Sequence, residues 1–233
     1  YGRLLADVKM LRVAYEAAGY RAGGRGMLLL ESRPAFFQHW FALNALGLSV
    51  VPVNPDLRTA ELKFIAGHAR PCLAVATGRG FEDLQLASCD SGVNFPVITP
   101  DAPLPVTASC EPVTDMLVEP LRRESAMLYT SGTTGQPKGC VLANLYFLNA
   151  GLWYNEAGGL CSLTGDGERM ITPLPMFHMN AMACSLMAMV MAGGCLTALD
   201  RFHPLSWWAS VRESRATCLH YLGVMLSILM KAP

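Results

Sequence analysis

Residues 129–139 constrain the chain most, because they combine three glycines with a run of hydroxyl side chains and a single lysine. They read Tyr-Thr-Ser-Gly-Thr-Thr-Gly-Gln-Pro-Lys-Gly. Glycine permits positive φ, so backbone N–H groups can turn towards a bound anion. The hydroxyls can donate hydrogen bonds to phosphate oxygens, and the lysine adds a compact positive charge. We therefore predict a polyphosphate-binding loop, called the phosphate loop below, formed by Thr130, Ser131, Gly132, Thr133, Thr134, Gly135 and Lys138.

The residues 129–139 have two other interpretations. A Walker A loop requires G-x-x-x-x-G-K-[ST]. Counted from Gly132, its second glycine falls on Pro137, and its final Ser or Thr falls on Gly139. A plain solvated loop is the other alternative, but such loops rarely combine hydroxyls with a Pro-Lys-Gly exit. The apolar run 126–129 before the loop predicts a buried strand that holds it in place.

The phosphate loop is similar to the phosphate-binding signature of the adenylate-forming superfamily, which includes acyl-CoA synthetases, luciferases and peptide-synthetase adenylation domains. Residues 48–55, 173–178 and 219–230 resemble further segments of that family, in the same order. The resemblance covers nearly the whole chain, but only the first half of a family member. It implies an α/β fold with mostly parallel sheets flanked by helices, as an incomplete N-terminal domain of the acyl-CoA synthetase/luciferase-like fold.

The resemblance also implies a chemistry. An ATP-dependent acid–CoA ligase activates a small carboxylic acid as an acyl-adenylate and then forms an acyl-CoA thioester, using ATP, Mg²⁺ and CoA. Lys138 and His178 are the implied catalytic residues. The implied substrate pocket contains His178, Tyr221, Gly223 and Val224. Its apolar lining favours a fatty or other small apolar acid, and the expected lining residues are Met176, Met179, Met182, Leu219, Leu222 and Met225.

His178 has more than one interpretation. A histidine between Phe177 and Met179 can be an ordinary packed residue. The preceding strand and prolines place it at the carboxyl end of a strand, where ligands of open α/β sheets collect. By resemblance it lies between the carboxylate and the α-phosphate, where it either stabilises negative charge or gates the acyl tunnel. The sequence leaves both roles open.

Several parts of the family pattern are absent from these 233 residues. They are the adenine-binding segment, the metal-binding acid, the ribose-binding aspartate and the C-terminal domain with its catalytic lysine. We find no convincing carboxylate ligand for Mg²⁺, so no metal-binding residue is predicted. We expect that this chain alone forms no adenylate. The alternatives are an amino-acid adenylation domain, or a non-catalytic nucleotide- or partner-binding module of the same fold.

Composition excludes some classes of function. Lys plus Arg and Asp plus Glu number 18 each, so no overall field favours nucleic acid. Only 15% of residues are charged and the mean hydropathy is +0.30, which indicates surface that another part or partner covers. The eight cysteines are scattered, and we interpret them as reduced thiols of a cytoplasmic protein. Residues 170–199 lack charged side chains, but prolines and glycines interrupt them, so no integral membrane segment is predicted. The sequence leaves open whether the protein forms a homodimer.

Periodicity predicts alternating helices and strands, and hence a mostly parallel sheet covered on both sides. We expect two lobes, residues 26–150 ending with the phosphate loop, and residues 1–25 plus 165–233. Residues 100–120 contain five prolines and are predicted to be an ordered surface connection. The predicted helices are 4–18, 35–45, 59–66 with Thr59 as N-cap, 144–153, 180–192 and 204–214. The predicted strands are 27–30, 48–53, 72–76, 126–129, 169–172, 195–199 and 217–221.

Overall fold

A computed structural model describes residues 1–106, 110–130, 136–164 and 167–231. The chain divides into two compact units, Tyr1–Asn144 and Leu145–Pro233. The expected lobes differ from this division at the N-terminus, because α1 (Gly2–Ala17) packs against α2 (Pro34–Leu46) inside the first unit. Tyr15 and His39 join these two helices through a hydrogen bond of 2.6 Å between Oη and Nδ1. Residues 1–25 therefore group with the first unit rather than with residues 165–233.

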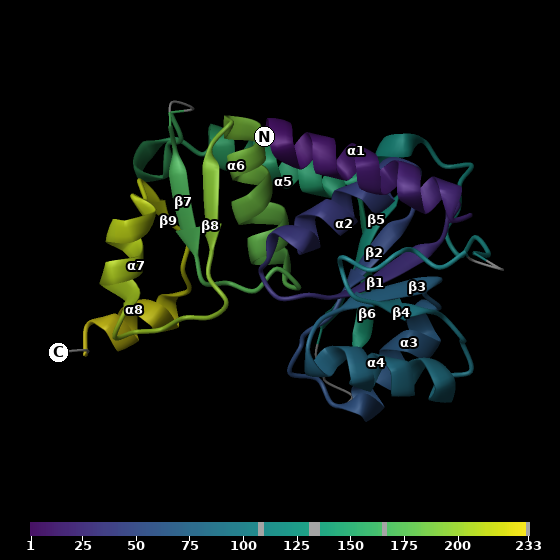
Figure 1. Cartoon of the computed structure of the whole chain (residues 1–233). Helices are drawn as coiled ribbons and strands as arrows, with labels where there is room; N and C mark the ends of the chain where they lie inside the picture. The colour runs from purple at the N-terminus through teal and green to yellow at the C-terminus, as the bar shows by residue number, and fades with distance from the viewer. Residues whose placement is uncertain (107–109, 131–135, 165–166, 232–233) are drawn as a thin grey trace. The chain divides into compact units, whose positions relative to one another are not determined.

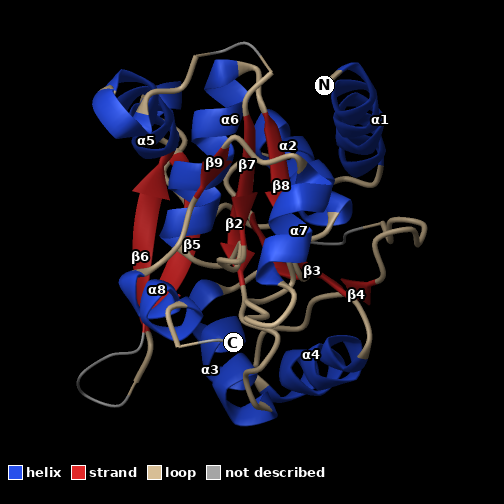
Figure 2. Cartoon of the chain, turned by 90° about the vertical axis from the view of Figure 1, so that its left-hand side faces the viewer, coloured by secondary structure: helices blue, strands red, loops and turns tan. Residues whose placement is uncertain are grey.

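The first unit contains a six-stranded sheet in the order β4-β3-β1-β2-β5-β6. All neighbouring pairs are parallel except β5 and β6, which are antiparallel. Figure 2 shows β6 and β4 at opposite edges of this sheet. The prediction of a mostly parallel α/β fold is thus confirmed. The strands are β1 (Arg25–Leu29), β2 (Ser49–Pro52), β3 (Leu73–Ala76), β4 (Val97–Ile98), β5 (Glu124–Thr130) and β6 (Lys138–Ala143).

Helices cover both faces of this sheet. Figure 1 shows α1 and α2 on one face and α3 (Thr59–Ala69) and α4 (Arg79–Asp90) on the other. Every residue of β1, β2 and β3 is buried. Strands buried on two faces read as continuous apolar runs, which is why the sequence pattern located them. The core under α3 and α4 includes Met27, Val51, Leu62, Ile65, Leu84 and Phe95.

One local prediction was wrong, and several elements were not predicted. The N-cap of α3 is Arg58, and Thr59 is its first helical residue. The Thr59 hydroxyl instead donates to Asp83 Oδ1 at 3.0 Å, and the Glu61 carboxylate accepts from the Arg58 N–H at 2.9 Å. Helix α4 and strand β4 were not predicted. Strand β6 was not predicted either, although it immediately follows the phosphate loop.

The second unit contains a parallel three-stranded sheet in the order β8-β7-β9. Figure 1 shows α6 and α7 on opposite sides of this sheet. The predicted helix 180–192 consists of a π-helical segment, η3 (Asn180–Ser185), followed by α6 (Leu186–Ala192). The other elements are α5 (Asn144–Glu156), β7 (Arg169–Thr172), β8 (Cys195–Ala198), α7 (Trp207–Ser214), β9 (Cys218–Leu219) and α8 (Gly223–Leu229), with 3₁₀ turns at Pro120–Arg122 in the first unit and Gly159–Cys161 in the second.

Helix α5 packs on α6 through a close backbone contact. A Cβ on Gly151 would lie 2.9 Å from the Met187 carbonyl oxygen, so only glycine fits this position. Asn155 Nδ2 donates to the Ala188 carbonyl at 3.1 Å. Among the residues that the structure describes, no helix has both the length and the apolar character needed to cross a membrane.

Candidate active site

The two ends of the phosphate loop lie side by side in the antiparallel ladder of β5 and β6. Thr130 pairs with Lys138, and Tyr129 pairs with Gly139. The connection 131–137 therefore leaves and re-enters the sheet at adjacent positions. Thr130 and Lys138 are both exposed. The other five predicted loop residues, Ser131, Gly132, Thr133, Thr134 and Gly135, lie outside the described residues.

A buried ion pair fixes the beginning of β5, the strand that leads into the loop. Arg25 donates from Nε and Nη2 to the two carboxylate oxygens of Glu124, at 2.7 Å each. The Ser49 hydroxyl donates to Glu124 Oε1 at 2.7 Å, and Arg25 Nη1 donates to the Ala69 carbonyl at 3.1 Å. Such charge-assisted bidentate contacts are strong and geometrically specific. They join β1, β2 and β5 at the beginning of each strand.

Asn44 makes a second connection to β5, this time from α2. Its Oδ1 accepts hydrogen bonds from the Ser125 hydroxyl at 2.6 Å and from Trp40 Nε1 at 2.9 Å. Its Nδ2 donates to the carbonyl oxygens of Leu48 and Ser125, at 2.8 and 3.0 Å. One amide thus satisfies polar groups of α2, β5 and the residue before β2 that would otherwise be buried without partners.

Close to the loop, the side chain of Tyr129 is held by α3. Its hydroxyl and His68 Nδ1 are 2.6 Å apart, and the His68 ring stacks on Phe64 with centroids 6.0 Å apart. Burial raises the pKa of Tyr129 to about 12, so the phenol stays protonated near neutrality. On the neighbouring strand, a Cβ on Gly139 would lie 2.9 Å from Met127 Sδ. The glycine allows β6 to approach the side chains of β5.

His178 follows β7 in the second unit, at the carboxyl edge of the three-stranded sheet. Its N–H donates to the Pro175 carbonyl, and its own carbonyl accepts from the Met182 N–H, both at 3.0 Å. The imidazole is exposed, and its centroid lies 4.6 Å from that of Phe177. Partial burial lowers the pKa of His178, which favours the neutral ring. A neutral imidazole can donate one hydrogen bond and accept another.

The four residues predicted to form the substrate pocket are all exposed, His178 after β7 and Tyr221, Gly223 and Val224 in and before α8. The apolar residues expected to line the pocket differ in exposure. Met176, Met182 and Met225 are buried, while Met179, Leu219 and Leu222 are at least 36% exposed.

A polar contact in the second unit was not predicted from the sequence. Ser185 Oγ and His220 Nδ1 form a short hydrogen bond, and the His220 N–H donates to the Ile171 carbonyl at 3.1 Å. The Tyr154 ring centroid lies 5.9 Å from that of His220. Burial lowers the pKa of His220, which favours a neutral ring. The contact joins the π-helical segment to residues 219–230, and only the position of His220 in that segment gave a sequence signal for it.

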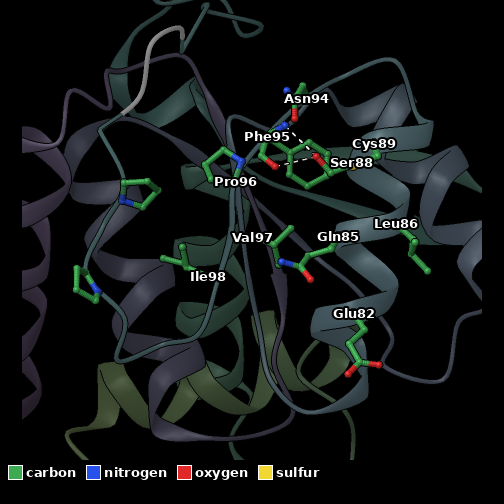
Figure 3. Close-up of a pocket in the computed structure, with 12 residues that line it drawn as sticks. Glu82, Gln85, Leu86, Ser88, Cys89, Asn94, Phe95, Pro96, Val97 and Ile98 are labelled. Atoms are coloured by element: carbon green, nitrogen blue, oxygen red, sulfur yellow. Dashed lines mark hydrogen bonds between the residues drawn. The ribbon is translucent and has the colours of Figure 1, made fainter.

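A cavity of about 760 Å³ lies elsewhere in the first unit, between α4, β4 and the following prolines. Figure 3 shows Glu82, Gln85 and Leu86 on the helical side and Val97 and Ile98 on the strand side. Ser88 closes its upper end by accepting from the Phe95 N–H at 2.9 Å and donating to the Phe95 carbonyl at 2.7 Å. No predicted site residue lines this cavity.

Mg²⁺ is held in proteins by oxygen ligands, chiefly carboxylates and water. Among the described residues, no group of three or more His, Cys, Asp or Glu side chains is placed to hold a metal ion. A divalent cation normally takes several oxygen ligands from protein, water and substrate phosphates.

The sequence profile of the family described as AMP-binding enzyme matches residues 1–233. The chain belongs to the AMP-binding enzyme family. The resemblance of the phosphate loop to this superfamily is thus confirmed, and it extends over the whole chain.

Individual relatives agree with this assignment. The chain is 28% identical over 245 residues to a crotonobetaine/carnitine–CoA ligase of Citrobacter koseri, covering 100% of the chain and 47% of the relative. Among solved structures, the N-terminal domain of FACL13 from Mycobacterium tuberculosis matches with a TM-score of 0.82 and 22% identity, covering 100% of this chain and 58% of that one. An o-succinylbenzoate CoA synthetase from Bacillus subtilis matches with a TM-score of 0.77 and 21% identity, covering 99% and 57%. The chain thus spans about half the length of the curated relatives it matches.

Proposed function

We propose that the chain is part of an acid–CoA ligase that activates a carboxylate with ATP and transfers the acyl group to CoA. In the first step a carboxylate oxygen attacks the α-phosphorus of ATP and displaces pyrophosphate. In the second step the CoA thiol attacks the acyl carbonyl and displaces AMP. The family match over residues 1–233 is the observation that carries this proposal. Relatives named as CoA ligases support it.

Within this scheme the phosphate loop binds the β- and γ-phosphates. Triphosphate binding gathers several negative charges, which need donors and cations placed before the reaction. The exposed ammonium group of Lys138 is available for this role, and the ladder with Thr130 fixes its backbone at the loop exit. His178 contributes a neutral imidazole at the carboxyl edge of β7, where it can donate to the carboxylate or to a developing oxyanion.

Lys138→Ala tests the loop assignment directly. Binding of ATP and of inorganic tripolyphosphate is measured by equilibrium dialysis with the 233-residue chain. Losing a charged hydrogen-bond donor to phosphate should weaken binding roughly tenfold to a hundredfold. Lys9→Ala is the matched control, because Lys9 is an exposed lysine on α1. Equal binding by the two variants would remove Lys138 from the nucleotide site.

The activity itself requires a second experiment. A polypeptide extended to the length of the relatives is assayed for ATP–pyrophosphate exchange with a panel of carboxylates, and then for CoA thioester formation. We expect exchange that depends on a small apolar acid and a thioester that depends on CoA. His178→Ala should slow the exchange more than it weakens ATP binding, because the ring acts at the carboxylate. Exchange with amino acids and no thioester would instead favour an amino-acid adenylation domain.

A further inference from the structure

Two cysteines that are far apart in the sequence lie close together at the end of the six-stranded sheet where strands β1 and β3 begin. Cys72 immediately precedes β3, and its N–H donates to the Arg25 carbonyl at 2.8 Å. The Cys72 thiol lies 3.3 Å from the same carbonyl oxygen. Cys110 lies in the proline-rich connection, and its sulfur is 3.8 Å from the Arg21 carbonyl oxygen. The two side chains are hydrogen-bonded to each other.

Gly24 provides the space in which the sulfurs meet. A Cβ on Gly24 would lie 2.4 Å from Cys110 Sγ and 3.1 Å from Cys72 Sγ. Both sulfurs therefore lie close to one point above this glycine. Any side chain there would overlap with Cys110, so the glycine is needed for the two thiols to approach.

The backbone around the pair is also fixed. The Gly23 carbonyl accepts from the Val113 N–H at 2.9 Å and from the Thr114 N–H and hydroxyl at 3.1 Å each. The Gly23 N–H donates to the Gly47 carbonyl at 2.9 Å. Val113 and Thr114, which follow Cys110, and Cys72 itself thus bond to the segment 23–25, which holds the two thiols in place in the folded chain.

The surroundings give the two sulfurs different reactivity. The hydrogen bond from Cys72 is the largest cause that lowers the pKa of Cys110, to about 7, and Arg21 contributes through its backbone and its charge. The same hydrogen bond and burial raise the pKa of Cys72. Burial raises the pKa values of the nearby Tyr15 and Tyr20, so both phenols stay neutral. Cys110 is partly exposed whereas Cys72 is buried, so an oxidant in solution reaches Cys110 first.

We propose that Cys110 and Cys72 form a redox-modifiable pair, in which a hydroperoxide oxidises Cys110 and Cys72 then closes an intramolecular disulfide. The Cys110 thiolate attacks one peroxide oxygen, the O–O bond breaks, and Cys110 becomes a sulfenic acid while the peroxide is reduced. The Cys72 sulfur then attacks the Cys110 sulfur and displaces hydroxide, which takes the Cys72 proton and leaves as water. Two thiols and one peroxide yield one disulfide and, for hydrogen peroxide, two waters. The product joins the connection 100–120 covalently to the beginning of β3.

The test treats the reduced 233-residue chain with an equimolar amount of hydrogen peroxide at pH 7, followed by proteolysis and mass spectrometry. We expect the Cys72–Cys110 peptide to be the main cross-link, in a monomer that has lost two hydrogens. Cys110→Ala should abolish the cross-link. Cys72→Ala should leave Cys110 as a sulfenic acid that dimedone traps. Cys89→Ala is the matched control, since Cys89 is an exposed free thiol, and it should leave the yield unchanged.

A second measurement separates a reactive pair from two thiols that are merely packed together. Alkylation of Cys110 is followed against pH in the native chain and in Cys72→Ala. Removing the hydrogen-bond donor should move the midpoint upward by about 1.5 pH units, towards the ordinary thiol value. An unchanged midpoint, or cross-links to Cys89 or Cys140 as abundant as the Cys72–Cys110 link, would refute the proposal. Neither measurement depends on the proposed ligase activity.

Discussion

Replacing Glu124 with alanine would remove the carboxylate that joins the beginnings of β1, β2 and β5. The exposed fractions of the side chains are only 11% for Arg25 and 6% for Glu124. After the substitution the Arg25 guanidinium would stay buried, with its hydrogen bond to the Ala69 carbonyl but without its counter-charge, and the Ser49 hydroxyl would lose its acceptor. Removing one partner of a buried ion pair costs about 3–5 kcal/mol, because the other charge is left uncompensated.

We therefore expect the free energy of unfolding to fall by about 4 kcal/mol, a large share of the 5–15 kcal/mol that is usual for a domain. Glu31→Ala is the matched control. Glu31 Oε2 lies 2.6 Å from Arg33 Nη2, as close as the buried pair, but the two side chains are 47% and 56% exposed. Solvent screens such a pair, so its loss should cost less than about 1 kcal/mol.

The assay is urea denaturation followed by circular dichroism, with amide hydrogen exchange of β1 and β5 to locate the effect in the first unit. Peptides from the second unit serve as an internal reference, because the ion pair lies entirely in the first. If Glu124→Ala and Glu31→Ala destabilise the chain equally, burial is not what distinguishes the two pairs, and the reasoning fails.

Two further predictions concern pH and packing. Burial lowers the pKa of His39 to about 4, whereas an unfolded histidine titrates near 6.5, so the unfolded chain binds the extra proton between these values. The free energy of unfolding should therefore fall by up to about 3 kcal/mol as the pH drops from 6.5 to 4, and His39→Gln should flatten this part of a stability–pH profile. Gly139→Ala would bring a Cβ within 2.9 Å of Met127 Sδ. Calorimetry should show that the free energy of unfolding falls by about 1–3 kcal/mol, and dialysis should show weaker tripolyphosphate binding. Gly2→Ala, with nothing within 4 Å of its Cβ, should change neither.

Sequence patterns predicted those strands well whose signal lies within the strand itself. Strands β1, β2 and β3 are buried on both faces, so each is an apolar run between turn residues. Strand β4 has only two residues and follows Pro96, which leaves no period to detect. Strand β6 lies at the sheet edge and contains no buried residue, so its pairing with β5 defines it better than its own composition does.

The candidate site also contains both residues that a local motif identifies and contacts between residues far apart in the sequence. Lys138 and His178 stand in dense local motifs, so the sequence singles them out. The contact of Arg25 with Glu124 spans 99 positions, and that of Ser185 with His220 spans 35. The residues next to Glu124 and Ser185 in the sequence give no signal of a partner so far along the chain. Cys72 and Cys110 appeared as scattered thiols for the same reason, since only the folded sheet brings them together over Gly24.

The position of the ion pair on β5 leads to a final prediction about the loop. Glu124 begins the strand and Thr130 ends it, so the ion pair lies roughly 20 Å from the loop at the usual rise per residue. Strand β2 pairs with β5 only through Val50 and Ala126. Near the loop, the β6 ladder and the contact of Tyr129 with His68 are what hold β5.

Stability and phosphate binding should therefore respond to different substitutions. Tyr129→Phe removes one hydrogen bond of 2.6 Å and should cost only about 1 kcal/mol of stability. The same change releases the end of β5 next to the loop, so tripolyphosphate binding should weaken severalfold. Glu124→Ala should do the reverse, with a large loss of stability and unchanged binding by the molecules that remain folded. If dialysis under fully folding conditions shows that Glu124→Ala weakens binding as much as Tyr129→Phe, β5 transmits the loss of the ion pair along its length, and the loop is not held locally.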